Sequence, residues 1–257
     1  MSPDPAGIPG GAAPGDAPAA ADLDALLAGM ATVRAFPERL AAAGRALLGR
    51  PYRADTLVGG PGLPERLVTR LDAFDCVTFV ETVLALAAVP PALAGEAAAR
   101  AFAGRLAALR YLRGRVRYAD RNHYFVQWIR RNARAGLVRA LTRGYAWGGP
   151  QRRLALVPGV RPVRWRPRYL PVDRAAELVG RARAGDVVAF VSTRDDLDVF
   201  HVGLLAARGA ALRHASRSAG RVVEEPLAAF LARNTTPGLL LARPLPGRRL
   251  PFARRSP

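Results

Sequence analysis

Apolar residues recur at helical spacing through the first half of the chain. This spacing predicts two short helices between residues 23 and 48, and further helices over residues 95–112 and 121–133. The run from residue 76 to about residue 89 also places its apolar side chains on one face, as expected of a helix buried against a core. Residues 53–72 include a glycine- and proline-rich stretch and predict a loop.

The pattern changes after about residue 155. An irregular stretch punctuated by prolines is followed by short runs of β-type residues. These runs cover residues 186–192, 199–206, 210–215 and 238–243. Helices that come first and strands that come later predict an α+β fold with a segregated antiparallel sheet.

The first 22 residues are mainly proline, glycine, alanine and aspartate, and we expect a disordered leader or linker there. Residues 23–257 are predicted to form a single domain. The longest apolar run, residues 83–93, is much shorter than the ~20 residues that a transmembrane helix needs. The sequence as written begins without a basic segment followed by an apolar stretch, so it predicts no secretory signal.

The formal net charge is +19, with 39 basic and 20 acidic residues, and every basic residue is arginine. The arginines are spread along the chain, and neither a zinc-finger spacing nor an aromatic ribonucleoprotein motif accompanies them. We therefore do not expect nucleic acid as a partner. The charge instead favours attraction to an acidic polymer or an anionic envelope surface, which salt would weaken.

Cys76 is the only cysteine, so an internal disulfide is excluded. Asp75 is a good N-cap residue, which places Cys76 in the first turn of the predicted helix. Unpaired N–H groups and the helix dipole favour a thiolate there, and the same N–H groups can hold an oxyanion. Cys76 is therefore a candidate nucleophile, although a buried structural cysteine fits the local sequence equally well.

Only three histidines are available as a base, and two of them, His201 and His214, lie on strand-like runs. Residues 207–209 predict a tight turn between these runs. A hairpin centred between residues 207 and 208 would place the two histidines directly opposite each other, with Cβ atoms about 4.5–5.5 Å apart. One histidine could then orient the other, as in a catalytic triad. The alternatives are two unrelated strand histidines and a zinc site with Cys76, which no Cys-x-x-Cys spacing supports.

The third histidine, His123, lies between Arg121 and Tyr124 in an Arg-Asn-His-Tyr-Phe block. These three side chains could line a substrate cleft. A structural role for His123, packed under Trp128, fits the sequence equally well.

Five motifs occur in the order found in the NlpC-type cell-wall peptidase superfamily, whose members are papain-like cysteine hydrolases. They are Gly49-Arg50-Pro51-Tyr52, Phe74-Asp75-Cys76, Ala184-Gly185-Asp186-Val187-Val188-Ala189-Phe190, His201-Val202-Gly203 and His214-Ala215-Ser216. The Val-Thr-Phe-Val-Glu-Thr run at 77–82 and the block at 121–125 resemble one branch, the N-acetylmuramoyl-L-alanine amidase-like family, formerly a domain of unknown function. The resemblance covers about residues 40–245. Phe200 departs from it, because a small residue more often precedes this histidine, and we expect Phe200 to narrow the cleft.

The resemblance implies a papain-like, NlpC-type fold in which N-terminal helices pack on a small antiparallel sheet or barrel and a helix N-terminus carries the nucleophile. By position, Cys76 is the implied nucleophile, His201 the base and His214 the residue that orients the base, with Ser216 a lesser candidate for that third role. The residues expected to line the substrate cleft are Tyr52, Asp75, Thr78, Arg121, His123, Tyr124 and Ser216. No metal or other cofactor is implied.

The implied substrate is peptidoglycan or a muropeptide, cleaved at the amide between N-acetylmuramic acid and L-alanine through a thioester acyl-enzyme. Arg121 is expected to pair with carboxylates of the stem peptide. The alternatives are cleavage of the D-glutamyl–diamino acid bond, as in most of the superfamily, and an inert muropeptide-binding module. We expect the cell envelope or periplasm by resemblance, although the missing signal leaves the cytoplasm open, and we expect no obligate protein partner.

Overall fold

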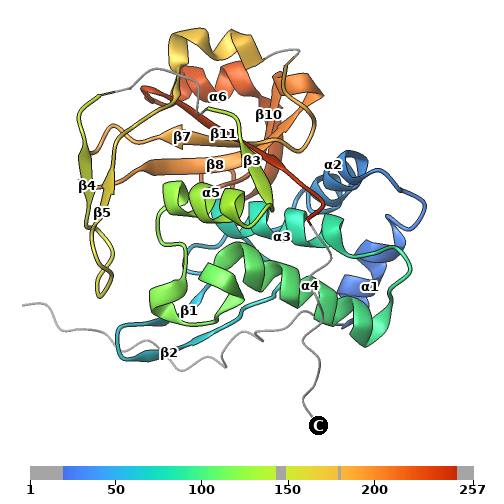
Figure 1. Cartoon of the computed structure of the whole chain (residues 1–257). Helices are drawn as coiled ribbons and strands as arrows, with labels where there is room; N and C mark the ends of the chain where they lie inside the picture. The colour runs from blue at the N-terminus through green and yellow to red at the C-terminus, as the bar shows by residue number, and fades with distance from the viewer. Residues whose placement is uncertain (1–19, 143–148, 179–180, 248–257) are drawn as a thin grey trace, which may run out of the picture.

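The chain folds into helices packed against an antiparallel sheet (Figure 1). A computed structural model describes residues 20–142, 149–178 and 181–247. Most of the predicted leader, residues 1–19, lies outside the described residues. Among the described residues, none of the helices is long and apolar enough to cross a membrane.

The helices predicted in the first half of the chain are confirmed. They are α1 (Ala20–Ala28), α2 (Phe36–Ala46), α3 (Cys76–Ala88), α4 (Gly95–Arg110) and α5 (Phe125–Arg134). The last helix begins four residues later than expected, because the segment before it is held extended against the end of α4. There, the Asn122 N–H donates to Arg110 O at 2.9 Å, and Arg121 forms a β-bridge with Tyr111.

The four predicted strand runs appear as β7 (Val187–Val191), β8 (Val199–Ala206), β9 (Ala211–Ser216) and β11 (Gly238–Pro244). The sheet also contains three strands that the sequence pattern did not predict: β3 (Val138–Ala140), β6 (Leu170–Pro171) and β10 (Arg221–Pro226). Its order is β10-β9-β8-β7-β11-β3, and β6 also pairs with β11. All of these pairings are antiparallel, which confirms the predicted α+β class.

The region predicted as a loop over residues 53–72 contains a small hairpin. Its strands are β1 (Val58–Gly60) and β2 (Leu63–Arg66). A second hairpin, formed by β4 (Arg152–Leu154) and β5 (Val163–Trp165), lies in the proline-rich stretch. A short helix, α6 (Leu227–Arg233), follows β10 directly.

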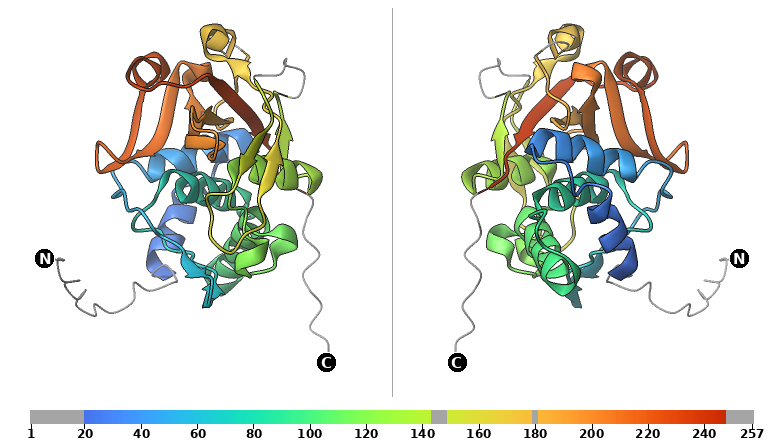
Figure 2. Two further views of the ribbon diagram at one scale, coloured as in Figure 1. Left: turned by 90° about the vertical axis from the view of Figure 1, so that its left-hand side faces the viewer. Right: turned by 90° about the vertical axis from the view of Figure 1, so that its right-hand side faces the viewer.

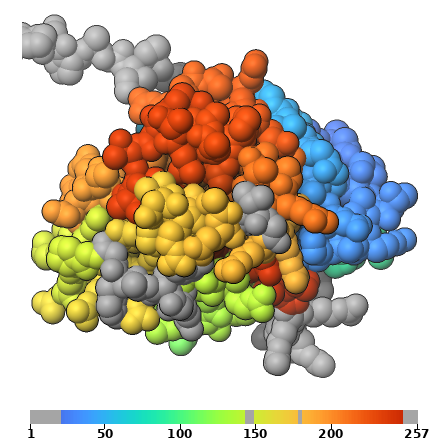
Figure 3. Space-filling model, turned by 90° about the horizontal axis from the view of Figure 1, so that it is seen from above, coloured from blue at the N-terminus to red at the C-terminus, as the bar shows by residue number. Residues whose placement is uncertain are grey.

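Apolar side chains cover both faces of the sheet, because its central strands alternate between two cores. On one face, Val187, Ala189 and Val202 belong to the core that surrounds α3, where residues 78–87 are all buried. On the other face, Val188 and Phe190 pack with side chains of α6. The sheet is therefore enclosed between α3 and α6 (Figures 1 and 2). Viewed from above, the red and yellow segments that include α6 and the 3₁₀ helix η3 (Val172–Leu178) cover its upper face (Figure 3).

Candidate active site

Cys76 is the first residue of α3, and Asp75 is its N-cap, as predicted. Asp75 Oδ1 accepts hydrogen bonds from the backbone N–H groups of Val77 and Thr78, each at 2.8 Å. The Thr78 hydroxyl accepts the Asp75 N–H at 3.0 Å, which completes a capping box. The Thr56 hydroxyl donates to the other carboxylate oxygen at 2.8 Å. This local network fixes the position of the cysteine at the start of the helix.

The environment of the thiol differs from the predicted one. Burial and then the negative charge of Asp75 raise the pKa of Cys76 to about 12, although the Val202 backbone N–H donates toward the sulfur. The N–H groups of Cys76 and Val77 at the helix terminus do lower this pKa, as predicted, but burial and Asp75 outweigh them and favour the thiol. Asp75 occupies two of the N–H groups of the first turn and adds a negative charge beside the sulfur.

Tyr52 lies beside Cys76, where the resemblance expects a cleft residue. Its N–H donates to Gly220 O at 2.8 Å, and the next N–H, of Arg53, donates to Phe74 O at 2.9 Å. The segment thus links the β9–β10 turn to the residues that lead into α3. Burial raises the pKa of the Tyr52 hydroxyl, and the neighbouring Cys76 and Asp75 raise it further, so this hydroxyl stays protonated.

The structure brings His201 and His214 into direct contact. His201 Nε2 and His214 Nδ1 are 2.7 Å apart, and the two rings are nearly perpendicular, at 89°. His201 is next in sequence to Val202, whose N–H reaches the Cys76 sulfur. Burial, followed by the neighbouring His214, lowers the pKa of His201 to about 3, so its imidazole is neutral at rest.

The predicted hairpin register is wrong by two positions. Leu204 pairs with Arg213 and Ala206 with Ala211, so Gly203 rather than His201 comes opposite His214. Four residues, 207–210, separate the paired Ala206 and Ala211, whereas the predicted register left only two, because residues 207–209 form a 3₁₀ turn with positive φ angles. The two histidines still meet, because a shift of the pairing register by two residues keeps each side chain on the same face of its strand. Gly203 leaves room for this arrangement, since a Cβ atom there would lie 3.1 Å from the His214 Cβ.

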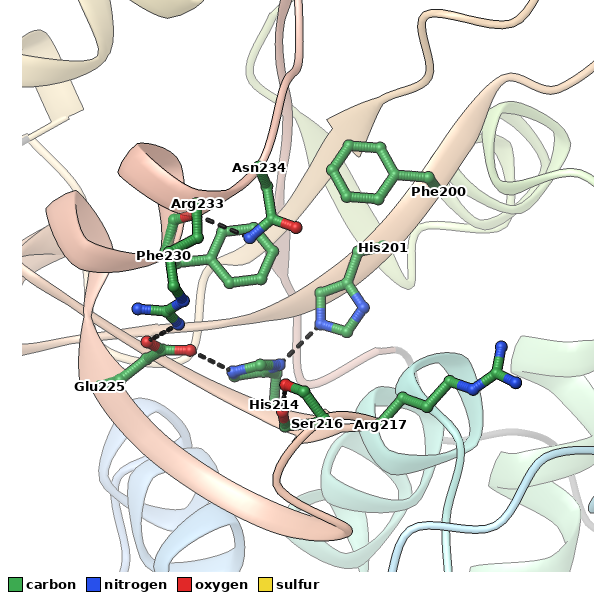
Figure 4. Close-up of a pocket in the computed structure, with 10 residues that line it drawn as sticks. Phe200, His201, His214, Ser216, Arg217, Glu225, Phe230, Arg233 and Asn234 are labelled. Carbon is green, nitrogen blue, oxygen red and sulfur yellow. Dashed lines mark hydrogen bonds and ion pairs between the residues drawn. The ribbon is translucent and has the colours of Figure 1, made fainter.

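Three further side chains extend the histidine pair, and the sequence pattern did not indicate them (Figure 4). Glu225 Oε1 lies 2.9 Å from His214 Nε2, and Arg233 binds the other carboxylate oxygen of Glu225. The ring of Phe230 stacks on His201, with centroids 5.3 Å apart, and meets His214 edge-on. Glu225 reaches the histidine diagonally, since its neighbour on the same face of β10, Val223, pairs with His214.

A cavity of about 660 Å³ opens onto the histidine pair and this extension. Its lining residues are Phe200, His201, His214, Ser216, Arg217, Ser218, Glu225, Phe230, Arg233 and Asn234. Ser216 therefore lies in the cavity wall, where its hydroxyl contacts that of Ser218 at 3.1 Å. Phe200 also lines the cavity, so it occupies space there.

Sequence comparison identifies the family. Residues 42–239 match the AmiA-like family, described as N-acetylmuramoyl-L-alanine amidase-like. The chain belongs to this amidase-like family. At the level of the family, the protein is an amidase-type hydrolase related to peptidoglycan.

Solved structures agree with this assignment. An N-acetylmuramoyl-L-alanine amidase from Bacteroides uniformis is 27% identical and has a TM-score of 0.68, with 82% of this chain and 99% of that chain covered. A Bacteroides fragilis protein with a provisional description as a xylanase is also 27% identical, with a TM-score of 0.63 and coverage of 78% and 98%. A Legionella pneumophila protein at 20% identity shares the fold, with a TM-score of 0.67 and coverage of 89% and 95%. No curated protein matches the chain.

The other predicted cleft residues of this amidase-like protein already have partners within the fold. Arg121 forms an ion pair with Glu65 at 2.5 Å, and His123 Nε2 lies 2.7 Å from Tyr118 O. The hydroxyl of the buried Tyr124 accepts the Val157 N–H at 3.2 Å. These contacts join the approach to α5 to its neighbours, and an Arg121 contact with substrate would compete with the Glu65 ion pair. Contact of these side chains with substrate stays a prediction.

Asp75 and Thr78 likewise form the capping box of α3, and their contact with substrate also stays a prediction. Among the described residues, no three His, Cys, Asp or Glu side chains are grouped so that they could hold a metal ion.

Proposed function

We propose that the protein is a papain-like, NlpC-type cysteine amidase that cleaves the amide between N-acetylmuramic acid and L-alanine in muropeptides. The observation that supports this most strongly is the 2.7 Å contact between His201 Nε2 and His214 Nδ1, in a chain whose lone cysteine is the first residue of a capped helix. A backbone hydrogen bond from Val202 on β8 to the Cys76 sulfur places the start of α3 against the strand that carries His201. Membership of the amidase-like family supports an amide as the bond that is cleaved.

In the proposed acylation step, the neutral imidazole of His201 takes the proton of the Cys76 thiol while the sulfur attacks the lactyl carbonyl carbon. The backbone N–H of Cys76 is the donor left for the oxyanion, since Asp75 holds those of Val77 and Thr78. The imidazolium of His201 then protonates the amine of L-alanine as the C–N bond breaks. The product on the enzyme is a thioester between Cys76 and the lactyl group.

Deacylation reverses the roles of the same groups. His201 takes a proton from water, and the resulting hydroxide attacks the thioester carbonyl. The C–S bond breaks, and His201 returns the proton to the sulfur of Cys76. The sugar leaves as its free acid, and no cofactor is consumed.

The resting site holds a thiol and a neutral imidazole rather than an ion pair. Burial raises the pKa of Cys76 and lowers that of His201, so both groups are uncharged at neutral pH. When substrate is bound, the negative charge of the attacking sulfur passes to the substrate's carbonyl oxygen, which lies at the N-terminus of α3. We therefore expect proton transfer to accompany attack on the carbonyl rather than to precede it.

Mass spectrometry of N-acetylmuramoyl tetrapeptide incubated with wild type and with Cys76→Ala tests this function. The proposal predicts free N-acetylmuramic acid and an intact tetrapeptide from wild type, and no product from the variant at equal folded concentration. A sugar that carries a dipeptide would instead identify an endopeptidase for the D-glutamyl–diamino acid bond. Unchanged substrate with both proteins would favour an inert muropeptide-binding module.

A further inference from the structure

The carboxylate of Glu225 defines where the protons lie in the histidine pair. Burial raises the pKa of Glu225, but the hydrogen bonds from Arg233 and His214 outweigh this effect and lower the pKa overall. The side chain is therefore an ionised carboxylate, which only accepts hydrogen bonds. In its 2.9 Å contact with His214, the proton must belong to His214 Nε2.

The proton on His214 Nε2 decides the state of the other nitrogens. Burial lowers the pKa of His214 more than the Glu225 hydrogen bond raises it, so His214 is neutral and its Nδ1 has a free lone pair. In the 2.7 Å contact between the histidines, the donor must therefore be His201 Nε2. A neutral His201 that carries its proton on Nε2 has an unprotonated Nδ1.

We propose that Glu225 is a positioning residue that holds His201, through His214, in the tautomer whose Nδ1 accepts the proton of Cys76. This inference rests on the proposed role of His201 as the base. It adds Glu225 to His201 and His214, the two residues that the family resemblance implies. Without the carboxylate, His214 can carry its proton on Nδ1 and donate to His201 Nε2, which leaves the proton of His201 on the wrong nitrogen.

The surroundings of Glu225 suit this role. Arg233, on α6, binds the carboxylate oxygen that His214 does not use and so fixes the orientation of the carboxylate. Phe230, one turn earlier on α6, stacks on His201 and meets His214 edge-on, which limits rotation of both rings. Figure 4 shows Arg233, Glu225, His214 and His201 in one continuous line.

A Glu225→Gln variant tests the proposal, because it keeps the size of the side chain and removes its charge. We expect kcat on N-acetylmuramoyl tetrapeptide to fall about 10- to 100-fold with little change in KM, as for other residues that orient a catalytic group indirectly. Glu224→Gln is the matched control, since Glu224 is the preceding residue of β10 and pairs with Arg213 instead. Melting temperatures of both variants identify any effect that arises from unfolding.

Imidazole ¹⁵N NMR reads the tautomers directly and does not depend on the substrate. The chain has only three histidines, so the signals can be assigned by single His→Gln variants. We expect the Nε2–H form of both His201 and His214 in wild type and in Glu224→Gln, and a growing Nδ1–H population of both in Glu225→Gln. Nδ1–H tautomers in wild type, or unchanged tautomers together with unchanged kcat in Glu225→Gln, would overturn the proposal.

Alkylation of Cys76 by iodoacetamide separates failure of this inference from failure of the proposed function. If the muropeptide is not the substrate but the relay exists, the Glu225→Gln variant still shows altered tautomers and slower alkylation than Glu224→Gln. If the relay does not exist, alkylation and tautomers are the same in both variants, whatever the substrate is.

Discussion

The helix that provides Cys76 and the strands that provide the histidines are stabilised in different ways. The start of α3 is held by the capping box of Asp75, and its body is anchored by Glu81, a buried residue that binds Arg110 at 2.7 Å. His201 and His214 are instead held by contacts among side chains of β8, β9, β10 and α6, which meet at the edge of a cavity. We therefore expect changes within α3 to act mainly on stability, and changes in His201, His214 and Glu225 to act mainly on rate.

The largest effect on rate should follow removal of the base. We expect His201→Ala to lower kcat about 10³-fold or more, because His201 is the proposed base that takes the proton of Cys76. Glu96→Ala, which changes an exposed residue of α4, is the control, and its kcat should stay within a few-fold of wild type. Steady-state kinetics measures both variants. Equal losses of kcat in the two would argue against His201 as the base.

The largest effect on stability should follow disruption of the anchor of α3. Glu81→Gln leaves the Arg110 guanidinium buried without its counter-charge, and we expect the free energy of unfolding to fall by about 3–5 kcal/mol. Glu96→Gln, which breaks an exposed pair with Arg100, should change it by less than about 0.5 kcal/mol. Urea unfolding measures both. A Glu81→Gln variant that kept its stability but lost kcat would contradict the division of roles.

A smaller effect is expected when the charge of the cap is removed and its geometry is kept. Asn caps helices as well as Asp does, so Asp75→Asn should preserve stability to within about 0.5 kcal/mol. Loss of the negative charge should lower the pKa of Cys76, because Asp75 raises it. The rate of iodoacetamide alkylation at pH 8 should therefore rise several-fold over wild type. An unchanged or slower rate would show that burial alone determines the pKa of the thiol.

The pH dependence should report the buried state of the base. Burial lowers the pKa of His201, so the imidazole stays unprotonated, and active as a base, to lower pH than an exposed histidine does. We expect the acid limb of the kcat/KM profile to fall below pH 6.5, the ordinary value for histidine. A limb at or above that value would indicate a solvated His201 or an ion pair with Cys76.

The candidate nucleophile and its helix could be predicted because their signals are local. Asp75 and the apolar face after Cys76 are contiguous in the sequence, and the cap forms through residues at most three apart. The rarity of cysteine and histidine then restricted the choice of His201 and His214. The high pKa of the thiol could not be predicted, since it depends on burial that only the tertiary structure determines.

The hairpin register and the extension to Glu225 depend on features that sequence patterns encode weakly. Ala207 and Arg208 adopt positive φ angles of 45° and 55°, which are unusual for residues other than glycine, so the length of the turn was not evident. Strand β10 was missed because two glutamates interrupt its short apolar pattern. Its turn signal, Gly220 after Ser218, was present and could have indicated a second hairpin.

The proposed mechanism requires Cys76 to form a thioester with the lactyl group of N-acetylmuramic acid. Acid quenching of wild type during its first turnovers on N-acetylmuramoyl tetrapeptide, followed by mass analysis of the peptide that contains Cys76, tests it directly. We expect this peptide to gain one N-acetylmuramoyl group, which hydroxylamine removes, and we expect no such gain in Cys76→Ala. Product formation by Cys76→Ala at the wild-type rate, with no adduct on Cys76 in wild type, would exclude Cys76 as the nucleophile.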